Sequence, residues 1–141
     1  MTYALSWPLQ QAVYQLLRAD AALAALVGTR IYDAPLPPSE EAEPEGLYVT
    51  LGDERVDDWS TASDRGAAHL LTIAVNAPRR GFAEAKQAAG AISDAMLGGA
   101  LALSRGHAVL VHFAGALTRR AEGDALRRIE LRFRVTVEDT L

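Results

Sequence analysis

Cysteine is absent from this sequence of 141 residues, and Lys86 is the only lysine. Without cysteine the chain has no disulfide and no thiolate ligand for a metal, a composition that fits a reducing compartment. No run of about 18 apolar residues is present to cross a bilayer, and no basic-then-apolar leader is visible. We therefore expect a chain that is neither exported by such a leader nor held in a membrane.

The remaining composition is that of an ordinary globular protein. Hydrophobic residues make up 50% of the chain and charged residues 23%, and the net charge is −4. A chain of this length is most simply one domain, residues 1–141. The negative net charge argues against a protein whose whole surface binds nucleic acid.

The clearest periodic stretch covers residues 127–138. Apolar residues occupy alternate positions from Ile129 to Val137, with charged residues or threonine between them. A period of two sends the two sets of side chains to opposite faces of a sheet. The stretch therefore predicts a long strand with one dry face and one charged face.

The partner of this strand lies just upstream. Residues 109–118 are apolar and strand-like, and residues 119–124 supply turn chemistry. We expect residues 109–138 to form one long hairpin in which Val111, Phe113 and Leu117 share a face. An isolated hairpin is marginal in water, so other elements must cover its apolar side.

Apolar residues at helical spacing predict two main helices. The first opens at Trp7, and a short second turn follows, capped by Asp20 and ended by Gly28. The other main helix covers residues 82–97, with an alanine-rich face that allows close packing on a sheet. We expect both helices to lie on one side of the sheet.

Alternating residues predict two further strands, at 47–52 and 69–76, and at most a short strand at 30–32. Residues 34–46 contain four prolines and four glutamates and predict an exposed loop. Residues 53–66 predict a long polar loop around Trp59. The order helix, strand, strand, helix, strand, strand indicates an α+β domain with a mainly antiparallel sheet of about four strands.

Charge is unevenly placed along the chain. Residues 33–64 contain ten acids and one base, Arg55, whereas residues 119–134 contain six arginines and three acids. One interpretation is that both segments are solvated faces that keep the protein soluble. The other is that an acidic surface of one copy meets a basic surface of the next, as in a head-to-tail ring. Trp59 either meets another subunit or folds back on its own core.

No arrangement of residues predicts chemistry. The three histidines, expected on the sheet surface, are His69, His107 and His112, and they lack the spacing of a metal site. The alternative to this surface position is that His69 and His112 are neighbours on adjacent strands. The acids Asp53, Asp57 and Asp58 lack the pattern of a calcium loop, and the region of Ser60 lacks that of a nucleophile. We therefore expect no catalytic residue, no cofactor and no bound metal.

Several segments carry a resemblance that runs along nearly the whole chain. They are residues 9–33, Tyr48-Val-Thr-Leu-Gly, Asp58-Trp-Ser-Thr, Gly81-Phe-Ala-Glu-Ala-Lys and Leu131-Arg-Phe-Arg-Val-Thr-Val-Glu. Together they resemble the DUF3168 family, the tail terminator or tail completion proteins of tailed phages and gene transfer agents. The chain departs from this family in its longer loop at 34–46 and at Asn76, near which similar proteins often have tryptophan.

The resemblance implies a small α+β domain that acts mechanically and is not an enzyme. Such proteins form a hexameric ring with further copies of themselves, end the tail tube, and join it to a head-side stopper or connector protein. They are made in the bacterial cytoplasm and lie at the head-tail interface of the particle. DNA passes through the ring without sequence-specific binding, and no membrane is involved.

A closed ring requires two different surfaces on each copy. The candidate subunit-interface residues are Val56, Asp57, Asp58, Trp59, Arg128, Arg132 and Arg134. The alternative function is a small cytoplasmic protein-binding or regulatory α+β domain without catalysis. A hydrolase would require an ordered pocket with a perturbed histidine or carboxylate, and no sequence feature indicates one.

Overall fold

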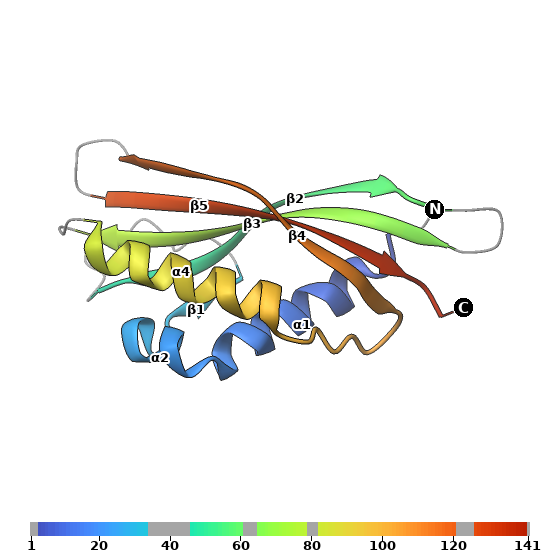
Figure 1. The fold of residues 1–141 in the computed structure, drawn as a ribbon, viewed down its shortest axis with the longest axis horizontal. Coiled ribbons are helices and arrows are strands. Elements are labelled where there is room, and N and C mark those ends of the chain that lie inside the picture. Colours follow the sequence, from blue (N-terminus) through green and yellow to red (C-terminus); the bar gives the residue numbers. More distant parts are fainter. Residues whose placement is uncertain (1–2, 34–45, 61–64, 79–81, 121–125, 141) are drawn as a thin grey trace.

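The computed structural model describes residues 3–33, 46–60, 65–78, 82–120 and 126–140. In this part of the chain a layer of helices packs on one face of a twisted five-stranded sheet (Figure 1). The predicted α+β fold is confirmed. The short strand predicted at 30–32 joins the sheet as its fifth strand. Most of the loop predicted at 34–46 and most of the turn predicted at 119–124 lie outside the described residues.

The helices follow the predicted signals. They are α1 (Ser6–Ala19), α2 (Ala21–Val27) and α4 (Ala83–Gly98). Asp20 caps α2 as predicted, since its carboxylate accepts a hydrogen bond of 2.9 Å from the amide of Leu23. Gly28 ends this helix with a φ of 60°, a conformation that glycine adopts without steric cost. None of the described helices is long and apolar enough to cross a membrane.

The sheet has the order β1-β2-β3-β5-β4. Its strands are β1 (Ile31–Tyr32), β2 (Tyr48–Asp58), β3 (Gly66–Pro78), β4 (His107–Arg120) and β5 (Leu126–Glu138). The short β1 pairs parallel with the start of β2, and every other neighbouring pair is antiparallel. Strands β2 and β4 are therefore the long outer strands, with β3 and β5 between them.

The prediction of a long polar loop at 53–66 is wrong for residues 53–58. Residues 53–58 continue β2 and pair with β3 as far as Asp58 opposite Ala67. A bulge lies between Leu51 and Glu54, so two residues of β2 oppose Thr72 alone. Before the bulge the odd-numbered residues of β2 face the core, and after it the even-numbered residues do. A search for apolar residues at every second position therefore loses the strand at this point.

The hairpin of β4 and β5 is confirmed, but the predicted shared face is not. Phe113 lies opposite Phe133, and Gly115 lies opposite Arg132, so β4 has one extra residue between these pairs. Leu117 consequently lies opposite Glu130, on the other face from Phe113. The prediction that Val111, Phe113 and Leu117 share a face is therefore wrong for Leu117.

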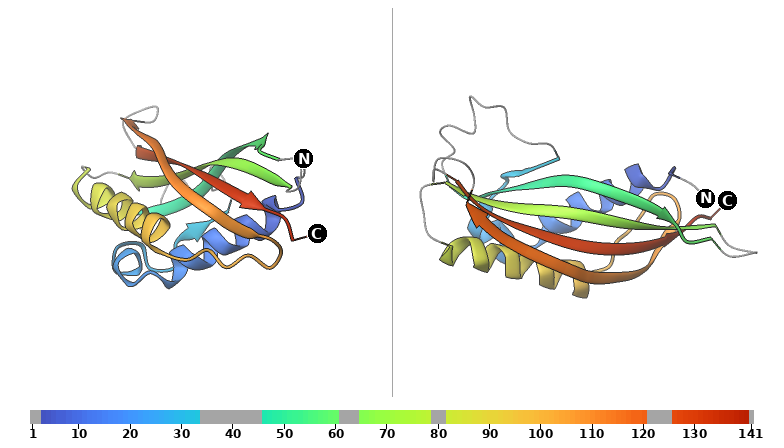
Figure 2. Two further views of the ribbon diagram at one scale, coloured as in Figure 1. Left: turned by 45° about the vertical axis from the view of Figure 1, so that its right-hand side comes forward. Right: turned by 90° about the horizontal axis from the view of Figure 1, so that it is seen from above.

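The hydrophobic core lies between the sheet and the helices. The dry face predicted for β5 is confirmed, because Ile129, Leu131, Phe133, Val135 and Val137 are all buried in this core. The alanines Ala85, Ala88 and Ala89 of α4 are also buried there, which lets the helix lie close to the strands. No described helix covers the opposite face, called the outer face below, which Figure 2 shows in its view from above.

Candidate interaction surfaces

A partly buried polar cluster lies beneath the sheet, where β2 and β3 meet the start of α1. Ser6 Oγ donates a hydrogen bond of 2.7 Å to Glu54 Oε1, and His69 Nδ1 lies 3.1 Å from Glu54 Oε2. His69 is 0% exposed, so its predicted place on the sheet surface is wrong. It lies opposite Val135, on the face that packs against the helices. The cluster thus connects α1 to the sheet.

The geometry of this cluster does not supply a nucleophile. Ser6 donates to the carboxylate of Glu54 and not to His69, and the lowered pKa of Glu54 makes this carboxylate a weak base for the serine proton. The hydrogen bond from His69 is the largest cause of a lowered pKa at Glu54. Burial opposes this effect, and the bond from Ser6 adds to it. Glu54 is thereby held ionised as a structural acceptor.

The other two histidines lie on β4 and are exposed. His107 Nε2 is 3.3 Å from Glu138 Oε2 on the neighbouring strand. His112 lies opposite Arg134 on the outer face, whereas His69 lies on the helix-covered face. His69 and His112 are therefore not cross-strand neighbours. Within the described residues, no three histidine, aspartate or glutamate side chains are grouped as ligands for a metal.

A second polar cluster lies on the outer face of the sheet. Arg128 Nε donates a hydrogen bond of 2.8 Å to Asn76 Oδ1, and the amide of Asn76 donates to Thr50 Oγ1 at 3.2 Å. Asn76 is fully buried, so its side chain requires these partners. Arg128 was a candidate for the subunit interface. The structure shows that its guanidinium also has a role within one copy, where it connects β5 to β3.

The remaining basic candidates, Arg132 and Arg134, are exposed side by side on the outer face of β5. Neither makes an ion pair with another described residue. Their neighbour Glu130 is instead paired with Arg119 of β4 at 2.6 Å. Arg132 and Arg134 are thus available to an external partner.

The acidic candidates lie at the far end of β2. Val56 is half-buried and packs against the core, Asp57 pairs with Arg55 at 3.1 Å, and Asp58 accepts a hydrogen bond of 2.8 Å from Ser60 Oγ. Trp59 is 47% exposed, and one edge of its ring lies over Gly66. Trp59 thus both covers part of its own chain and presents a wide apolar surface to solvent.

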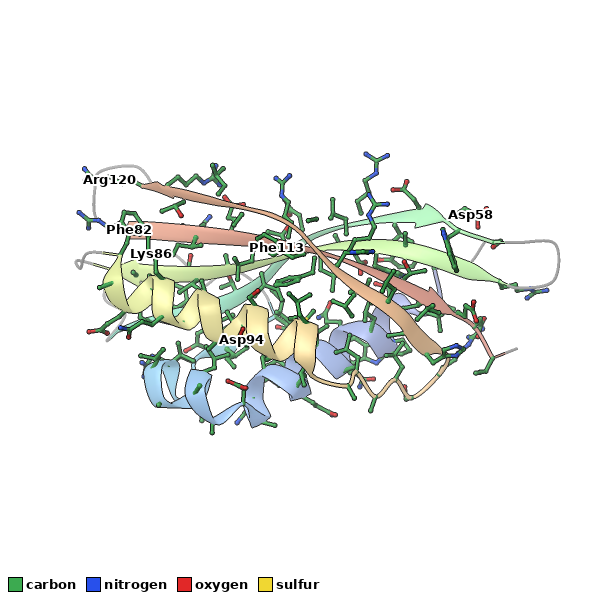
Figure 3. All side chains as sticks on the ribbon, viewed as in Figure 1. Asp58, Phe82, Lys86, Asp94, Phe113 and Arg120 are labelled. Atoms are coloured by element: carbon green, nitrogen blue, oxygen red, sulfur yellow. The ribbon has the colours of Figure 1, made fainter. Side chains whose placement is uncertain are left out.

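The structure does not bring the acidic and basic candidates into one site. Asp58 lies at one end of the sheet and Arg120, which follows Arg119 on β4, lies at the other (Figure 3). Strand β3 lies between β2 and β5 and pairs with both of them. The candidates therefore lie on separate strands of one copy, although Asp57 and Arg134 share the outer face of the sheet.

The exposed apolar side chains of β4 were not predicted from the sequence. Of the large hydrophobic side chains exposed in the described residues, half belong to β4: Val109, Leu110, Phe113 and Leu117. Phe113 contacts the buried Phe133 edge-on, with ring centroids 5.8 Å apart, and leaves its other side open. No described strand pairs with the outer edge of β4. Strand β4 thus exposes both apolar side chains and unpaired backbone.

A groove of about 360 Å³ lies between α1 and β1. Its walls include Trp7, Tyr14 and Tyr32 with the amides of Gln10 and Gln11. Aromatic and amide groups bind other molecules without reacting with them, so the groove has the chemistry of a contact surface.

Charged side chains are exposed on β2 and β5 and apolar side chains on β4, while the polar clusters join strands and helices. Such a fold is typical of a protein that binds other molecules. Residues 11–138 match the family described as Tail completion protein gp17. The chain therefore belongs to this family, whose members are structural proteins of virions and are not enzymes.

A solved structure agrees with this assignment. The chain is 50% identical to a protein in the structure described as the virion of a native gene transfer agent (GTA) particle. The match covers 97% of this chain and 99% of that one, with a TM-score of 0.87. No curated protein matches the chain. The resemblance to tail completion proteins and the expectation of a non-enzymatic protein are confirmed.

Proposed function

We propose that this tail completion protein forms a hexameric ring that ends the tail tube of a gene transfer agent or phage particle and joins it to the head-side connector. The observation that carries the proposal is the 50% identity, over almost the full length of both chains, to a protein of a gene transfer agent virion. The proposal has three parts. They are the ring itself, the tail tube protein and the head-side protein as partners, and the position at the head-tail interface.

The surfaces of the chain support a ring of identical copies. A cyclic ring requires that each copy present one surface to the copy before it and a different surface to the copy after it. The acidic end of β2 and the arginines of β5 differ in charge and lie on separate strands. Unlike charges of this kind set the orientation of partners more than their affinity. The chain thus has the asymmetry that a head-to-tail contact requires.

DNA passes through such a ring without sequence-specific binding. The net charge of −4 disfavours tight binding of DNA by the ring as a whole. This part of the proposal predicts no preference among DNA sequences in a binding assay at physiological salt.

The test of the ring is electron microscopy of the purified protein, alone and with tail tubes. We expect six-fold rings or capped tube ends in the mixture. A monomer in the absence of tubes agrees with the proposal if the tube end templates the ring. Uncapped tubes together with a monomeric protein at all concentrations would contradict it and would favour the alternative of a small protein-binding domain.

Charge reversal tests the basic candidates. The double variant Arg132→Glu, Arg134→Glu should lower the affinity between copies by about tenfold, because neither exposed arginine forms an ion pair with a described residue of its own copy. The control is Arg18→Glu, Lys86→Glu, which makes the same change of charge on exposed positions of α1 and α4. Normal rings from the first variant would show that Arg132 and Arg134 are not interface residues.

A further inference from the structure

Strand β4 combines apolar and basic character on a free edge of the sheet. Leu110 and Leu117 are 49% and 52% exposed, and β4 also bears His107, His112, Arg119 and Arg120. The strand contains no acidic residue. Long apolar edge strands are sites of association unless something covers them. The exposed side chains of β4 therefore indicate a partner with an apolar surface, because Arg119 and His107 already lie beside Glu130 and Glu138 of β5.

A second copy of β4 is a poor partner. In a two-fold contact of β4 with β4 the two strands run antiparallel, so the end with Arg119 and Arg120 lies beside the end with His107. Neither strand brings a carboxylate of its own to this contact. A strand that carries acidic groups is therefore a better partner than a second β4.

Strand β2 supplies such a surface on the opposite edge of the same sheet. Beyond Thr50, where its pairing with β1 ends, no described strand pairs with the outer edge of β2. This free portion bears exposed Asp53, Asp57 and Asp58 and leads directly to the half-exposed ring of Trp59. It therefore offers both acidic groups and an aromatic surface.

The directions of the strands fit a contact between these two edges. Each of the three pairings from β2 through β3 and β5 to β4 is antiparallel, so β4 runs opposite to β2. Copies placed side by side in the same orientation would bring β4 of one copy next to β2 of the following copy in antiparallel directions. Copies of a cyclic ring have this common orientation relative to the ring axis.

We propose that the outer edge of β4 is the surface that receives the next copy of this chain, through the free edge of its β2 between residues 51 and 59. This inference rests on the proposed ring and adds to it the pair of strands that closes each contact. It assigns the apolar side chains of β4 to the interface, in addition to the charged residues predicted from the sequence.

The absence of cysteine permits a direct test, because every disulfide then joins two introduced cysteines. One variant has a cysteine on β4, Leu110→Cys or Leu117→Cys, and the other has one on β2, Asp53→Cys or Asp57→Cys. The four combinations sample the register between the strands, since a disulfide requires Cα atoms within about 7 Å. The samples are oxidised on purified tail tubes, and Asp94→Cys on α4 replaces the β2 variant as the control.

We expect covalent dimers from at least one mixture of a β4 variant with a β2 variant, and none above background from either variant alone or with Asp94→Cys. Rings or capped tubes without these dimers would overturn the inference and leave the proposed function intact. Dimers from a β4 variant alone would also overturn it, because they indicate a two-fold contact. If the protein neither assembles nor forms covalent dimers on tail tubes, the proposed function itself is overturned.

A matched pair of variants provides an independent measurement. Leu110→Glu on β4 and Leu97→Glu on α4 change leucines of equal exposure, 49% each. Leu110→Glu should weaken assembly on purified tail tubes by about tenfold, as measured by co-sedimentation with the tubes, and Leu97→Glu by less than about twofold. Equal effects of the two variants would contradict a special role for β4.

Discussion

The two long outer strands, β2 and β4, are held to the rest of the molecule by different interactions. Strand β2 is joined to α1 by a polar cluster, in which Glu54 accepts hydrogen bonds from Ser6 and His69. Strand β4 contacts the core through side chains such as Phe113, which remains 48% exposed. The comparison shows that the carboxylate of Glu54 on β2 has its hydrogen-bond partners within one copy, whereas β4 leaves apolar side chains uncovered. Assembly can therefore stabilise β4 more than β2.

The largest change in the free energy of unfolding should come from the aromatic pair, Phe113 and Phe133, that joins β4 to the centre of the sheet. Phe133→Ala removes a fully buried ring and should lower the free energy of unfolding by about 4 kcal/mol. Phe113→Ala should cost only about 1 kcal/mol in the monomer, because half of this ring already contacts water. Urea denaturation measures both. Equal losses would show that Phe113 is as well packed as Phe133.

The anchor of β2 should be the next most sensitive feature. Glu54→Ala leaves the buried Nδ1 of His69 without its acceptor and should lower the free energy of unfolding by about 2 kcal/mol. The control is Asp57→Ala, which removes an exposed ion pair with Arg55 and should change stability by less than about 0.5 kcal/mol. A similar effect of both variants in urea denaturation would contradict the role of Glu54 as an anchor.

The same carboxylate predicts a smaller, pH-dependent effect. Because the pKa of Glu54 is lower in the folded protein than its ordinary value of 4.5, its ionised form favours folding. This contribution is complete above about pH 4.5 and is lost as the pH falls toward the lowered folded pKa. The difference in stability between the wild type and Glu54→Gln should therefore shrink between pH 6 and pH 3. A constant difference across this range would show that Glu54 does not titrate with folding.

Much of the fold was predictable because most buried residues follow simple periods. The alternation in residues 127–138 predicted β5 and its dry face, and the signals at Asp20 and Gly28 predicted the ends of α2. The far half of β2 was missed for a physical reason. Its inward position after the bulge is occupied by Glu54, a charged residue that no hydrophobic pattern identifies.

The interaction surfaces were less predictable than the fold. The extra residue between Phe113 and Gly115 moves Leu117 to the outer face, and no period in the sequence reveals such a shift. The exposure of Leu110 follows from the position of β4 at the edge, which depends on the strand order of the whole sheet. The charged candidates were identified because an excess of one charge is visible in the sequence alone.

A reconstruction of the assembled tail end by electron cryo-microscopy tests the central claim most directly, because it shows which edges of neighbouring copies meet. We predict a six-fold ring in which the outer edge of each β4 lies against residues 51–59 of the next copy, with Leu110 and Leu117 covered. A ring in which β4 faces solvent, or in which two β4 strands meet, would contradict the claim.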